Sequence, residues 1–312
     1  MKAILKSVSR SFYLSIKFLP RPLREPVSLA YLLARATDTI ADTAPIPAAT
    51  RLTTLLAFAR VIAGAADFDT VAEPLRAFAG QQSDPHERAL IENVRGCIAW
   101  LEQLEPADRD DIRAVLKTIV TGQQLDLTRF GDPVAFTSLQ TAAELDEYTY
   151  LVAGCVGEFW TKLGVRKAPP FATLAPNEMT KLGVTYGRGL QLINVLRDRG
   201  ADRQAGRSYL PAQELATRPE AEVFADWLNA AEAKIGAGID YCSALTSWRT
   251  RFATALPALI GARTIALLRA AESGAGKIKV PRKMVRRILL AALPAAASPS
   301  ALRALFQRLL AP

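Results

Sequence analysis

The chain has 312 residues, of which half are hydrophobic and 22% are charged, a composition that indicates a folded globular protein and excludes a disordered one. Its formal net charge of +9 indicates an anionic partner such as a phosphorylated substrate, an acidic membrane surface or a nucleic acid, although a generally basic proteome would explain the same charge. Three cysteines without CxxC spacing argue against a disulfide framework or a zinc site, so we expect a reducing compartment and a cytoplasmic protein.

The two ends of the chain bear on membrane contact. The N-terminal segment, residues 1–12, has no apolar core of signal-peptide length, and no window of about 18 uninterrupted apolar residues predicts a membrane-spanning helix. The C-terminal segment, residues 284–312, comes nearest, but Pro294 and Pro299 interrupt it. Its arginines and leucines fit a helix lying on a membrane surface, and packing on the protein's own body is the alternative that we favour. Peripheral contact with the inner face of the membrane therefore stays open.

Proline and glycine divide the chain into segments rich in Leu and Ala, which predict helices almost throughout. After a short N-terminal segment closed by PRPLREP (20–26), we expect helices over about 27–42, 48–64, 70–80, 84–104, 112–129, 138–164, 176–201, 219–246, 250–272 and 281–292. TRFGDP (128–133) and VRKAPPFATLAP (165–176) predict loops, but neither is typical of a domain linker. The expected fold is all-α, with one domain over residues 1–312.

The first candidate site is the stretch ARATDTIADT (34–43). On a helix, Asp38 and Asp42 share one face because they lie four residues apart. Two carboxylates in this position repel each other unless a cation lies between them. A DxxxD pattern by itself is more often a solvated helix face.

The second candidate site is QLINVLRDRGAD (191–202), in which Asn194, Asp198 and Asp202 follow at intervals of four and Gln191 lies one turn earlier. Read alone, this polar stripe fits a structural helix as well as a metal site. Two such oxygen-rich stripes on otherwise apolar helices are better explained by Mg²⁺, which takes one or two carboxylates, several waters and substrate phosphate.

Arginines accompany both stripes. Arg10 and Arg35 lie near the first, and Arg197, Arg199, Arg203 and Arg207 lie near the second. Solubility explains any single arginine, but guanidinium groups match phosphate oxygens. The whole set therefore predicts a site for metal ions and a diphosphate.

Other chemistries have little support. The single histidine, His86, lies at an expected helix start, which argues against a Ser-His-Asp triad. GAGKI (274–278) lacks the leading Gly and the final Ser or Thr of a phosphate loop, and no strand precedes GRGLQ (187–191). The only basic patch suited to nucleic acid is KIKVPRKMVRR (277–287), without a recognisable module, so we expect no nucleic-acid partner.

Four segments in this order resemble the signature segments of the squalene/phytoene synthase family, and the resemblance covers nearly the whole chain. They are SRSF (9–12), YLLARATDTIAD (31–42), EYTYLVAGCVG (147–157) and QLINVLRDRGADRQAGRSYLP (191–211). The resemblance implies a single-domain isoprenoid-synthase helical bundle around a central cavity, in which facing aspartate-rich helices bind Mg²⁺ and prenyl diphosphates. An apolar cavity would exclude the water that quenches an allylic carbocation.

The resemblance also implies a role for each matching position. The metal ligands or their support are Asp38, Asp42, Asn194, Asp198 and Asp202, and the substrate and diphosphate contacts are Ser9, Arg10, Arg35, Gln191, Arg197 and Arg207. Tyr148 matches a tyrosine implicated in proton removal, Tyr31 a further active-site position and Phe12 an aromatic of the cavity wall. Ala41 and Ala201 stand where other members have an acid, so the number of metal ions stays open.

Within the family, YTYLVAGCVGEFW (148–160) resembles squalene synthases more than phytoene synthases, and so do LPALIGARTIALL (256–268) and GKIKVPRKMV (276–285). This implies head-to-head condensation of two farnesyl diphosphates through presqualene diphosphate, followed by NADPH-dependent reduction to squalene. Lys277 and Lys279 would then contact NADPH or diphosphate, and solvated loop lysines are the alternative. A presqualene diphosphate, dehydrosqualene or phytoene synthase stays open, as do a C15 or C20 substrate and the oligomeric state. A non-catalytic membrane-binding helical protein is the alternative class, but it would not need the two acidic stripes.

Overall fold

The structure, a computed structural model, describes residues 2–9, 12–131, 136–271 and 278–311. These residues are almost entirely helical, which confirms the expected all-α class. The chain divides into two compact units, one of residues 1–17 and 21–132 and the other of residues 18–20 and 133–312. That the whole chain acts as one domain stays a prediction.

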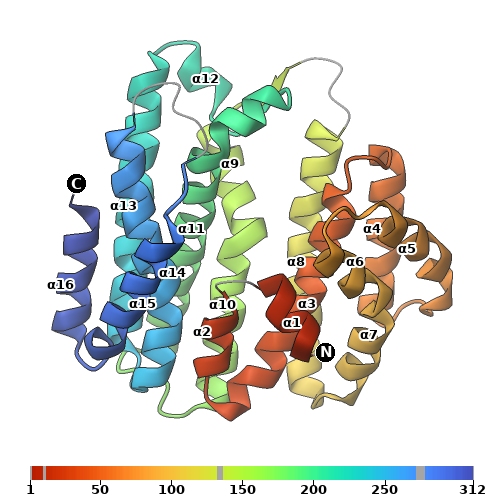
Figure 1. Ribbon diagram of the computed structural model, residues 1–312, viewed down its shortest axis with the longest axis horizontal. Helices are drawn as coiled ribbons and strands as arrows, with labels where there is room; N and C mark the ends of the chain where they lie inside the picture. The colour runs from red at the N-terminus through yellow and green to blue at the C-terminus, as the bar shows by residue number, and fades with distance from the viewer. Residues whose placement is uncertain (1, 10–11, 132–135, 272–277, 312) are drawn as a thin grey trace. The chain divides into compact units, whose positions relative to one another are not determined.

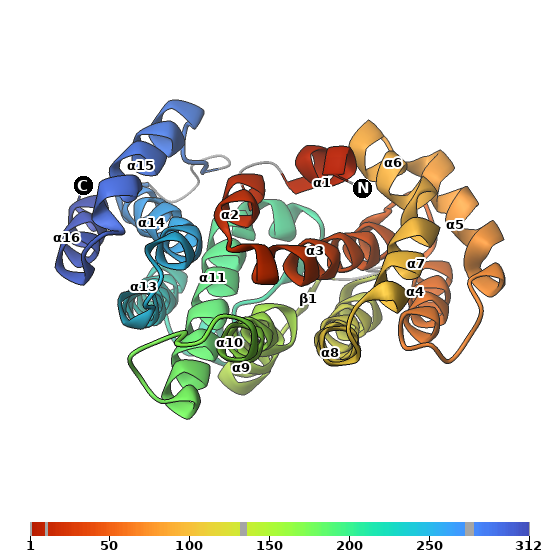
Figure 2. The ribbon, with the colours of Figure 1, turned by 90° about the horizontal axis from the view of Figure 1, so that it is seen from below.

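The N-terminal unit is built around α3 (Figures 1 and 2). Its elements are α1 (Lys2–Ser9), α2 (Phe12–Phe18), α3 (Arg21–Asp42), α4 (Ala48–Ile62), α5 (Asp69–Gln81), α6 (Pro85–Glu92), α7 (Val94–Gln103) and α8 (Pro106–Phe130). The last residue of α2, Phe18, belongs to the other unit. Helix α3 packs against α4, α6, α7 and α8. Its residues Leu29, Leu32, Leu33, Ala36 and Ile40 are fully buried, so one face of α3 holds the unit together and leaves the other face for polar groups.

The C-terminal unit is built around α11 (Figure 1). Its helices are α9 (Ala142–Thr149), the π-helix η1 (Tyr150–Gly154), α10 (Cys155–Lys167), α11 (Pro176–Gln204), α12 (Ala212–Leu215), α13 (Glu220–Ala244), α14 (Trp248–Ala270), α15 (Arg282–Ala295) and α16 (Pro299–Leu310). Two short strands, β1 (Thr137–Ser138) and β2 (Arg207–Ser208), pair in parallel. Helix α11 packs against α10, η1, α13 and α14, and this packing places its polar stripe.

Glycines allow α11 to approach α10 and η1 closely. A Cβ atom on Gly157 would lie 2.0 Å from the carbonyl oxygen of Gly183, and one on Gly187 would lie 2.2 Å from that of Ala153. Because these neighbours are backbone atoms, a side chain could enter only if the helices moved apart. The separation of the helices is therefore set by glycine.

The structure shifts several of the expected helix boundaries. The expected helix over 84–104 is divided at Asn93 into α6 and α7, and the one over 138–164 is divided into β1, α9, η1 and α10. A capping box starts α9: Thr141 Oγ1 accepts from the Glu144 backbone N–H, and the Glu144 side chain accepts from that of Thr141. The loop predicted over 165–176 is confirmed between α10 and α11.

The two ends of the chain contain more helix than expected. Residues 2–9 and 12–18 form α1 and α2, and α3 begins at Arg21 instead of near residue 27. Pro22 lies in the first turn of α3, where a missing N–H costs nothing, although Pro26 lies inside the helix. At the other end, Pro299 is the first residue of α16, so a further helix follows the one expected over 281–292.

Helix α14 is the one helix among the described residues that is long and apolar enough to cross a membrane, with a mean hydropathy of 1.3 over its best window. The sequence predicts no membrane-spanning helix here because polar residues interrupt the apolar run of α14. Of that window, 78% is buried inside the protein. The buried Arg251 near its start donates to the carbonyl oxygens of Cys242, Leu245 and Ala296, so α14 is bonded to its neighbours inside the C-terminal unit.

Candidate active site

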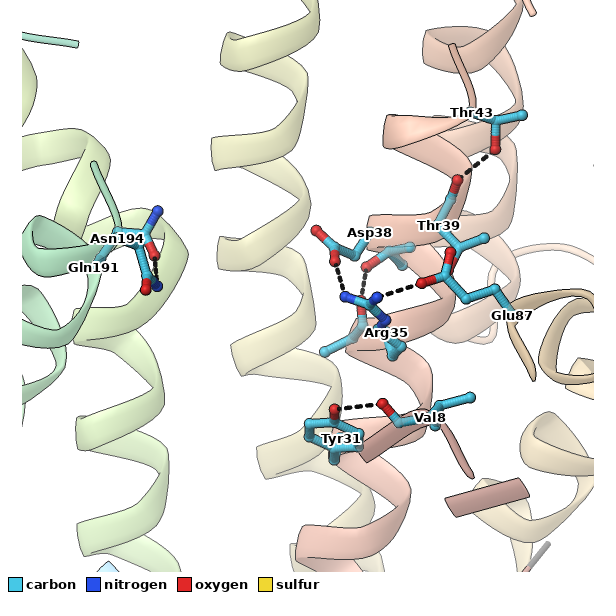
Figure 3. Close-up of polar contacts among 11 residues, drawn as sticks. Val8, Tyr31, Arg35, Asp38, Thr39, Thr43, Glu87, Gln191 and Asn194 are labelled. Atoms are coloured by element: carbon cyan, nitrogen blue, oxygen red, sulfur yellow. Dashed lines mark hydrogen bonds and ion pairs between the residues drawn. The ribbon is translucent and has the colours of Figure 1, made fainter. Parts of the chain in front are cut away.

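The first acidic stripe lies on α3, where one arginine joins two acids (Figure 3). Arg35 Nη1 donates to Asp38 Oδ2 at 2.8 Å, and its Nη2 donates to Glu87 Oε1 from α6. Thr39 Oγ1 donates to the other oxygen of Glu87 at 3.4 Å. The Arg35 guanidinium is therefore held on two sides before any substrate binds.

The Asp38 carboxyl is in an unfavourable place for a negative charge. Burial, and then the charge of Asp42 one turn later, raise the pKa of Asp38 to about 7, although Arg35 opposes them. The side chain keeps 43% of its surface accessible, so the carboxyl is half-buried and still open to a ligand. A cation beside the two carboxylates would remove this penalty.

The end of α3 that carries Asp42 is fastened by a buried arginine from α4. Arg51 donates to the carbonyl oxygens of Ala41 at 2.7 Å, Ile46 at 2.9 Å and Gly131 at 2.8 Å. The bond to Ala41 satisfies a carbonyl that the end of α3 leaves open, and the other two join Arg51 to the loop before α4 and to the end of α8. The exposed Asp42 thus stands on a rigid helix end.

Of the remaining predicted residues of the N-terminal unit, the structure describes the side chains of Tyr31 and Ser9. Tyr31, on the same helix as Arg35, donates its hydroxyl to the Val8 carbonyl oxygen at 3.3 Å (Figure 3). Ser9 is buried, and its hydroxyl donates to the Leu5 carbonyl of its own helix. Arg10 and the side chain of Phe12 lie outside the described residues.

The second polar stripe lies on α11, and its first part is a chain of hydrogen bonds. Asn194 Nδ2 donates to Gln191 Oε1 at 3.2 Å, and Gln191 Nε2 lies 3.5 Å from the hydroxyl of Tyr148 on α9 (Figure 3 shows the Asn194–Gln191 bond). The Tyr148 ring stacks on Tyr209 with 4.8 Å between centroids. Three predicted residues are thus brought together, and the orientation of the Tyr148 phenol is set by its neighbours.

The second part of the stripe pairs each aspartate with an arginine. Arg197 donates through two nitrogens to both oxygens of Asp198, and Arg207 Nε donates to Asp202 Oδ1 at 2.9 Å. Burial raises the pKa of Asp202, and Asp198 adds to this while Arg207 opposes it. Asp202 is only 8% exposed and is the one buried residue among the five predicted metal ligands.

Two arginines that the sequence predicted to lie beside this stripe instead contact helix α13. Arg199 and Arg203 both pair with Glu220 at the start of α13, at 3.4 and 2.9 Å, and Arg199 also lies over the Phe224 ring. Because side chains on a helix spread over its whole circumference, closeness in sequence did not place them beside Asp198. We interpret both as packing residues between α11 and α13.

The sequence predicts no role for two residues that contact predicted site residues, Glu87 beside Arg35 and Tyr209 beside Tyr148. Glu87 lies on a different helix from Arg35 and no spacing connects them, so no local signal was available. Tyr209 lies in the recognised segment 191–211 but had no assigned role. The π-helix η1, which begins two residues after Tyr148, is a further feature of this region, and such bulges are frequent at functional sites.

The donor atoms near Asp38 fit Mg²⁺. Within the described residues, no group of three or more His, Cys, Asp or Glu side chains is arranged as a complete protein cage for a metal ion. Mg²⁺ needs no such cage, because it is usually held by one or two carboxylates, with waters and phosphate as the other ligands. The observation in favour is that burial, and then the charge of Asp42, raise the pKa of Asp38, since a cation would offset both effects. For NADPH the described residues offer little, since Lys277 lies outside them and Lys279 is an exposed loop residue.

Comparison with solved structures defines the fold class. A structure of TcSQS with the ligand E5700 superposes with a TM-score of 0.74 over 99% of this chain and 89% of that one, at 22% identity. A dehydrosqualene synthase structure superposes with a TM-score of 0.61 over 93% of each chain, also at 22% identity. At this identity the likeness concerns the fold, which is the helical isoprenoid-synthase fold.

Sequence comparison defines the family. The family model for squalene/phytoene synthase matches residues 5–287. The 15-cis-phytoene synthase of Synechocystis sp. is 30% identical over 221 residues, which are 69% of this chain and 55% of that protein. Squalene synthase ERG9 of Saccharomyces cerevisiae is 28% identical over 210 residues, 67% of this chain and 44% of that protein. The chain therefore belongs to the squalene/phytoene synthase family, and it spans about half the length of these curated relatives.

Proposed function

We propose that this protein is a prenyltransferase that condenses two prenyl diphosphates head to head. The observation that carries the proposal is the half-buried Asp38, whose carboxyl lies beside Asp42 and is bonded to an arginine held by Glu87. Membership of the squalene/phytoene synthase family supports the same reaction. A helical binding protein would have no need of carboxylates kept in such an unfavourable place.

On α3, the residues would act on a diphosphate. Asp38 and Asp42 would hold Mg²⁺, which when bound supplies positive charge to the leaving diphosphate oxygens. Arg35 would donate hydrogen bonds to the same oxygens, and Glu87 and Thr39 would keep its guanidinium in place. Because burial and Asp42 raise the pKa of Asp38 to about 7, a cation bound beside the two carboxylates would lower that pKa and favour the ionised form.

On α11 and α9, the residues would complete the reaction. Asn194, Asp198 and Asp202 would form a second set of metal ligands, with Gln191, Arg197 and Arg207 as diphosphate contacts. The first condensation joins C1 of one prenyl chain to the double bond of the other, releases one diphosphate and loses one proton as the cyclopropane closes. The Tyr148 hydroxyl, held beside Gln191 and against Tyr209, would accept or pass on that proton.

For the product, we propose squalene from two farnesyl diphosphates, with NADPH reducing presqualene diphosphate as the second diphosphate leaves. Support comes from the segments 148–160, 256–268 and 276–285, which resemble squalene synthases. A synthase that makes presqualene diphosphate, dehydrosqualene or phytoene is the second candidate, because a phytoene synthase shares 30% identity with this chain. Lys279 would contact NADPH only under the first alternative.

The test is a product assay with and without reductant. The purified full chain is incubated with Mg²⁺ and either farnesyl or geranylgeranyl diphosphate, with and without NADPH, and the extracted lipids are identified by mass spectrometry. Squalene that forms from farnesyl diphosphate only with NADPH supports the first alternative. Presqualene diphosphate or dehydrosqualene without squalene when NADPH is present, or phytoene from geranylgeranyl diphosphate, supports the second. No condensation product from either substrate would contradict the proposed activity for these substrates.

A further inference from the structure

The excess positive charge of the chain is concentrated at its C-terminal end. Residues 273–312 contain eight Lys and Arg residues and no Asp or Glu. The first 272 residues are left with 31 basic and 30 acidic side chains, a net charge of +1. Almost all of the +9 thus lies in one short segment, so a generally basic composition does not explain it.

Helix α15 presents most of this charge on one face. Its exposed side chains include Lys283, Arg286, Arg287 and Leu290, which follow at intervals of three to four residues and therefore form a single stripe. The opposite face, with Ile288, is buried against α14 and α16. Figure 2 shows α15 on the outside of the helices of its own unit.

Among the described residues, the basic side chains of this face have no acidic partner. Within the part of the chain that the structure describes, no carboxylate forms an ion pair with Arg282, Lys283, Arg286 or Arg287. Arg303 on the neighbouring α16 differs, since it pairs with Asp240 at 3.1 Å. The charge on α15 is thus uncompensated and available to a partner that carries several negative charges.

The same face also exposes leucine. Leu290 is 69% exposed, the highest value among the large exposed hydrophobic side chains of the described residues, and Leu293 is 38% exposed. Both follow the arginines along the helix, so cations occupy the first two turns and leucines the last two. A nucleic acid or a free diphosphate would account for the cations but not for the leucines.

We propose that α15 is a membrane-docking helix that binds the surface of an anionic lipid bilayer. Lys283, Arg286 and Arg287 contact lipid phosphates, while Leu290 and Leu293 enter the boundary between headgroups and acyl chains. Since the leucines lie at one end, the C-terminal end of the helix enters more deeply than its N-terminal end. This arrangement matches the general pattern of interfacial amphipathic helices, whose binding combines charge attraction with partly buried apolar surface.

Vesicle binding tests the charge contribution. The purified full chain is sedimented with vesicles of phosphatidylcholine containing 30% phosphatidylglycerol and with vesicles of phosphatidylcholine alone, at about 50 and 500 mM salt. Since each basic residue near such a surface strengthens binding roughly fivefold, the double variant Arg286→Gln/Arg287→Gln should bind anionic vesicles about 25-fold more weakly. The matched control is Arg60→Gln/Lys117→Gln, which removes the same charge from exposed positions on α4 and α8 and should bind like the wild type.

A spectroscopic probe tests the leucine contribution. The three native cysteines are buried, so a polarity-sensitive dye attached to Leu290→Cys reports on this position alone. Its emission should shift to the blue with anionic vesicles, as expected for entry into the interface. The variant Leu290→Gln/Leu293→Gln should bind anionic vesicles about 10-fold more weakly, because the apolar contribution is lost while the charge is unchanged.

The outcomes separate membrane docking from its alternatives. Equal binding to neutral and anionic vesicles, unchanged binding by the arginine variant, or a probe without a blue shift would each overturn the proposal. The same arginine variant is tested with a short DNA duplex, and a loss of binding there without a loss on vesicles would show a nucleic-acid surface instead. Circular dichroism and the melting temperature confirm that the variants are folded. None of these readouts requires prenyltransferase activity, so they stay valid if the proposed function is wrong.

Discussion

Arg35 on α3 and Glu87 on α6 form an ion pair between residues that lie 52 positions apart in the chain. The pair places one guanidinium beside Asp38 and removes much of its freedom to rotate. Positioning of this kind is effective in catalysis because the group is already in place when charge develops, which in the proposed reaction occurs on the leaving diphosphate.

Replacing Glu87 tests this positioning role. Glu87→Gln should lower kcat/KM about 10-fold, in the range seen when a partner of a functional group is removed. Because Glu87 also raises the pKa of Asp38, the same variant should lower that pKa, which carboxyl NMR in metal-free protein can measure. The matched control is Glu92→Gln at an exposed position of the same helix. An unchanged kcat/KM together with an unchanged pKa of Asp38 would mean that Glu87 has no influence on the site.

The raised pKa of Asp38 predicts a pH-dependent stability of the metal-free protein. An unfolded aspartate has a pKa of about 3.9, and Asp38 in the folded protein has one of about 7. Between these values the folded state holds a proton that the unfolded state has lost, so the free energy of unfolding falls as the pH rises. Asp38→Asn removes this penalty and should be the more stable protein at pH 8 but not at pH 4.

Solvent screening limits the size of this effect. Since 43% of the Asp38 side chain is accessible, we expect only about 1 kcal/mol, or about 2 °C in melting temperature. Melting curves with a chelator at the two pH values measure it. The prediction is wrong if Asp38→Asn melts below the wild type at pH 8, or if the difference does not change with pH. Adding Mg²⁺ should raise the melting temperature of the wild type more than that of the variant.

Asp198 should be needed for the first condensation. Asp198→Asn keeps the shape of the side chain but removes the charge that would bind Mg²⁺, so we expect turnover to fall at least 1,000-fold with little change in melting temperature. Steady-state rates with a saturating prenyl diphosphate measure this. The control is Asp110→Asn, at an exposed position of α8, which should behave like the wild type. Near-normal turnover by Asp198→Asn would contradict its role as a metal ligand.

The Tyr148 hydroxyl should affect turnover more than binding. In Tyr148→Phe the stacking on Tyr209 is kept while the hydroxyl beside Gln191 is lost. We expect kcat to fall about 100-fold with KM nearly unchanged, as for removal of an acid–base group. Tyr150→Phe, two residues later, loses only a hydrogen bond to Glu158 and serves as the control. Equal kinetic effects of the two variants would argue against proton transfer by Tyr148.

The approach of α11 to η1 should depend on Gly187. A Cβ at this position would lie 2.2 Å from a backbone oxygen, so Gly187→Ala should lower the free energy of unfolding by about 1–3 kcal/mol. Gly200→Ala on the same helix meets no atom within 4 Å and should raise it by up to about 1 kcal/mol. Urea unfolding of both variants measures the difference. A rise in the free energy of unfolding of both variants would mean that helix propensity, and not the close approach, decides at Gly187.

Residues within one helix were predictable when spacing alone determined their relation. Asp38 and Asp42 share a face wherever that segment is helical, and the structure has both on α3. The same holds for Asn194, Asp198 and Asp202 on α11, because a helix repeats every 3.6 residues. Spacing was misleading for Arg199 and Arg203, since it does not show which neighbouring helix supplies a partner, and Glu220 of α13 is that partner.

The all-α class and the two acidic stripes follow from the sequence because hydrophobic periodicity and helix geometry are local properties. So does the concentration of charge in residues 273–312, which needs only a count. The partners of those stripes depend on contacts between distant segments, such as Glu87 with Arg35 and Tyr209 with Tyr148. Only the tertiary structure decided these, because packing of one helix on another brings together residues that no local pattern connects.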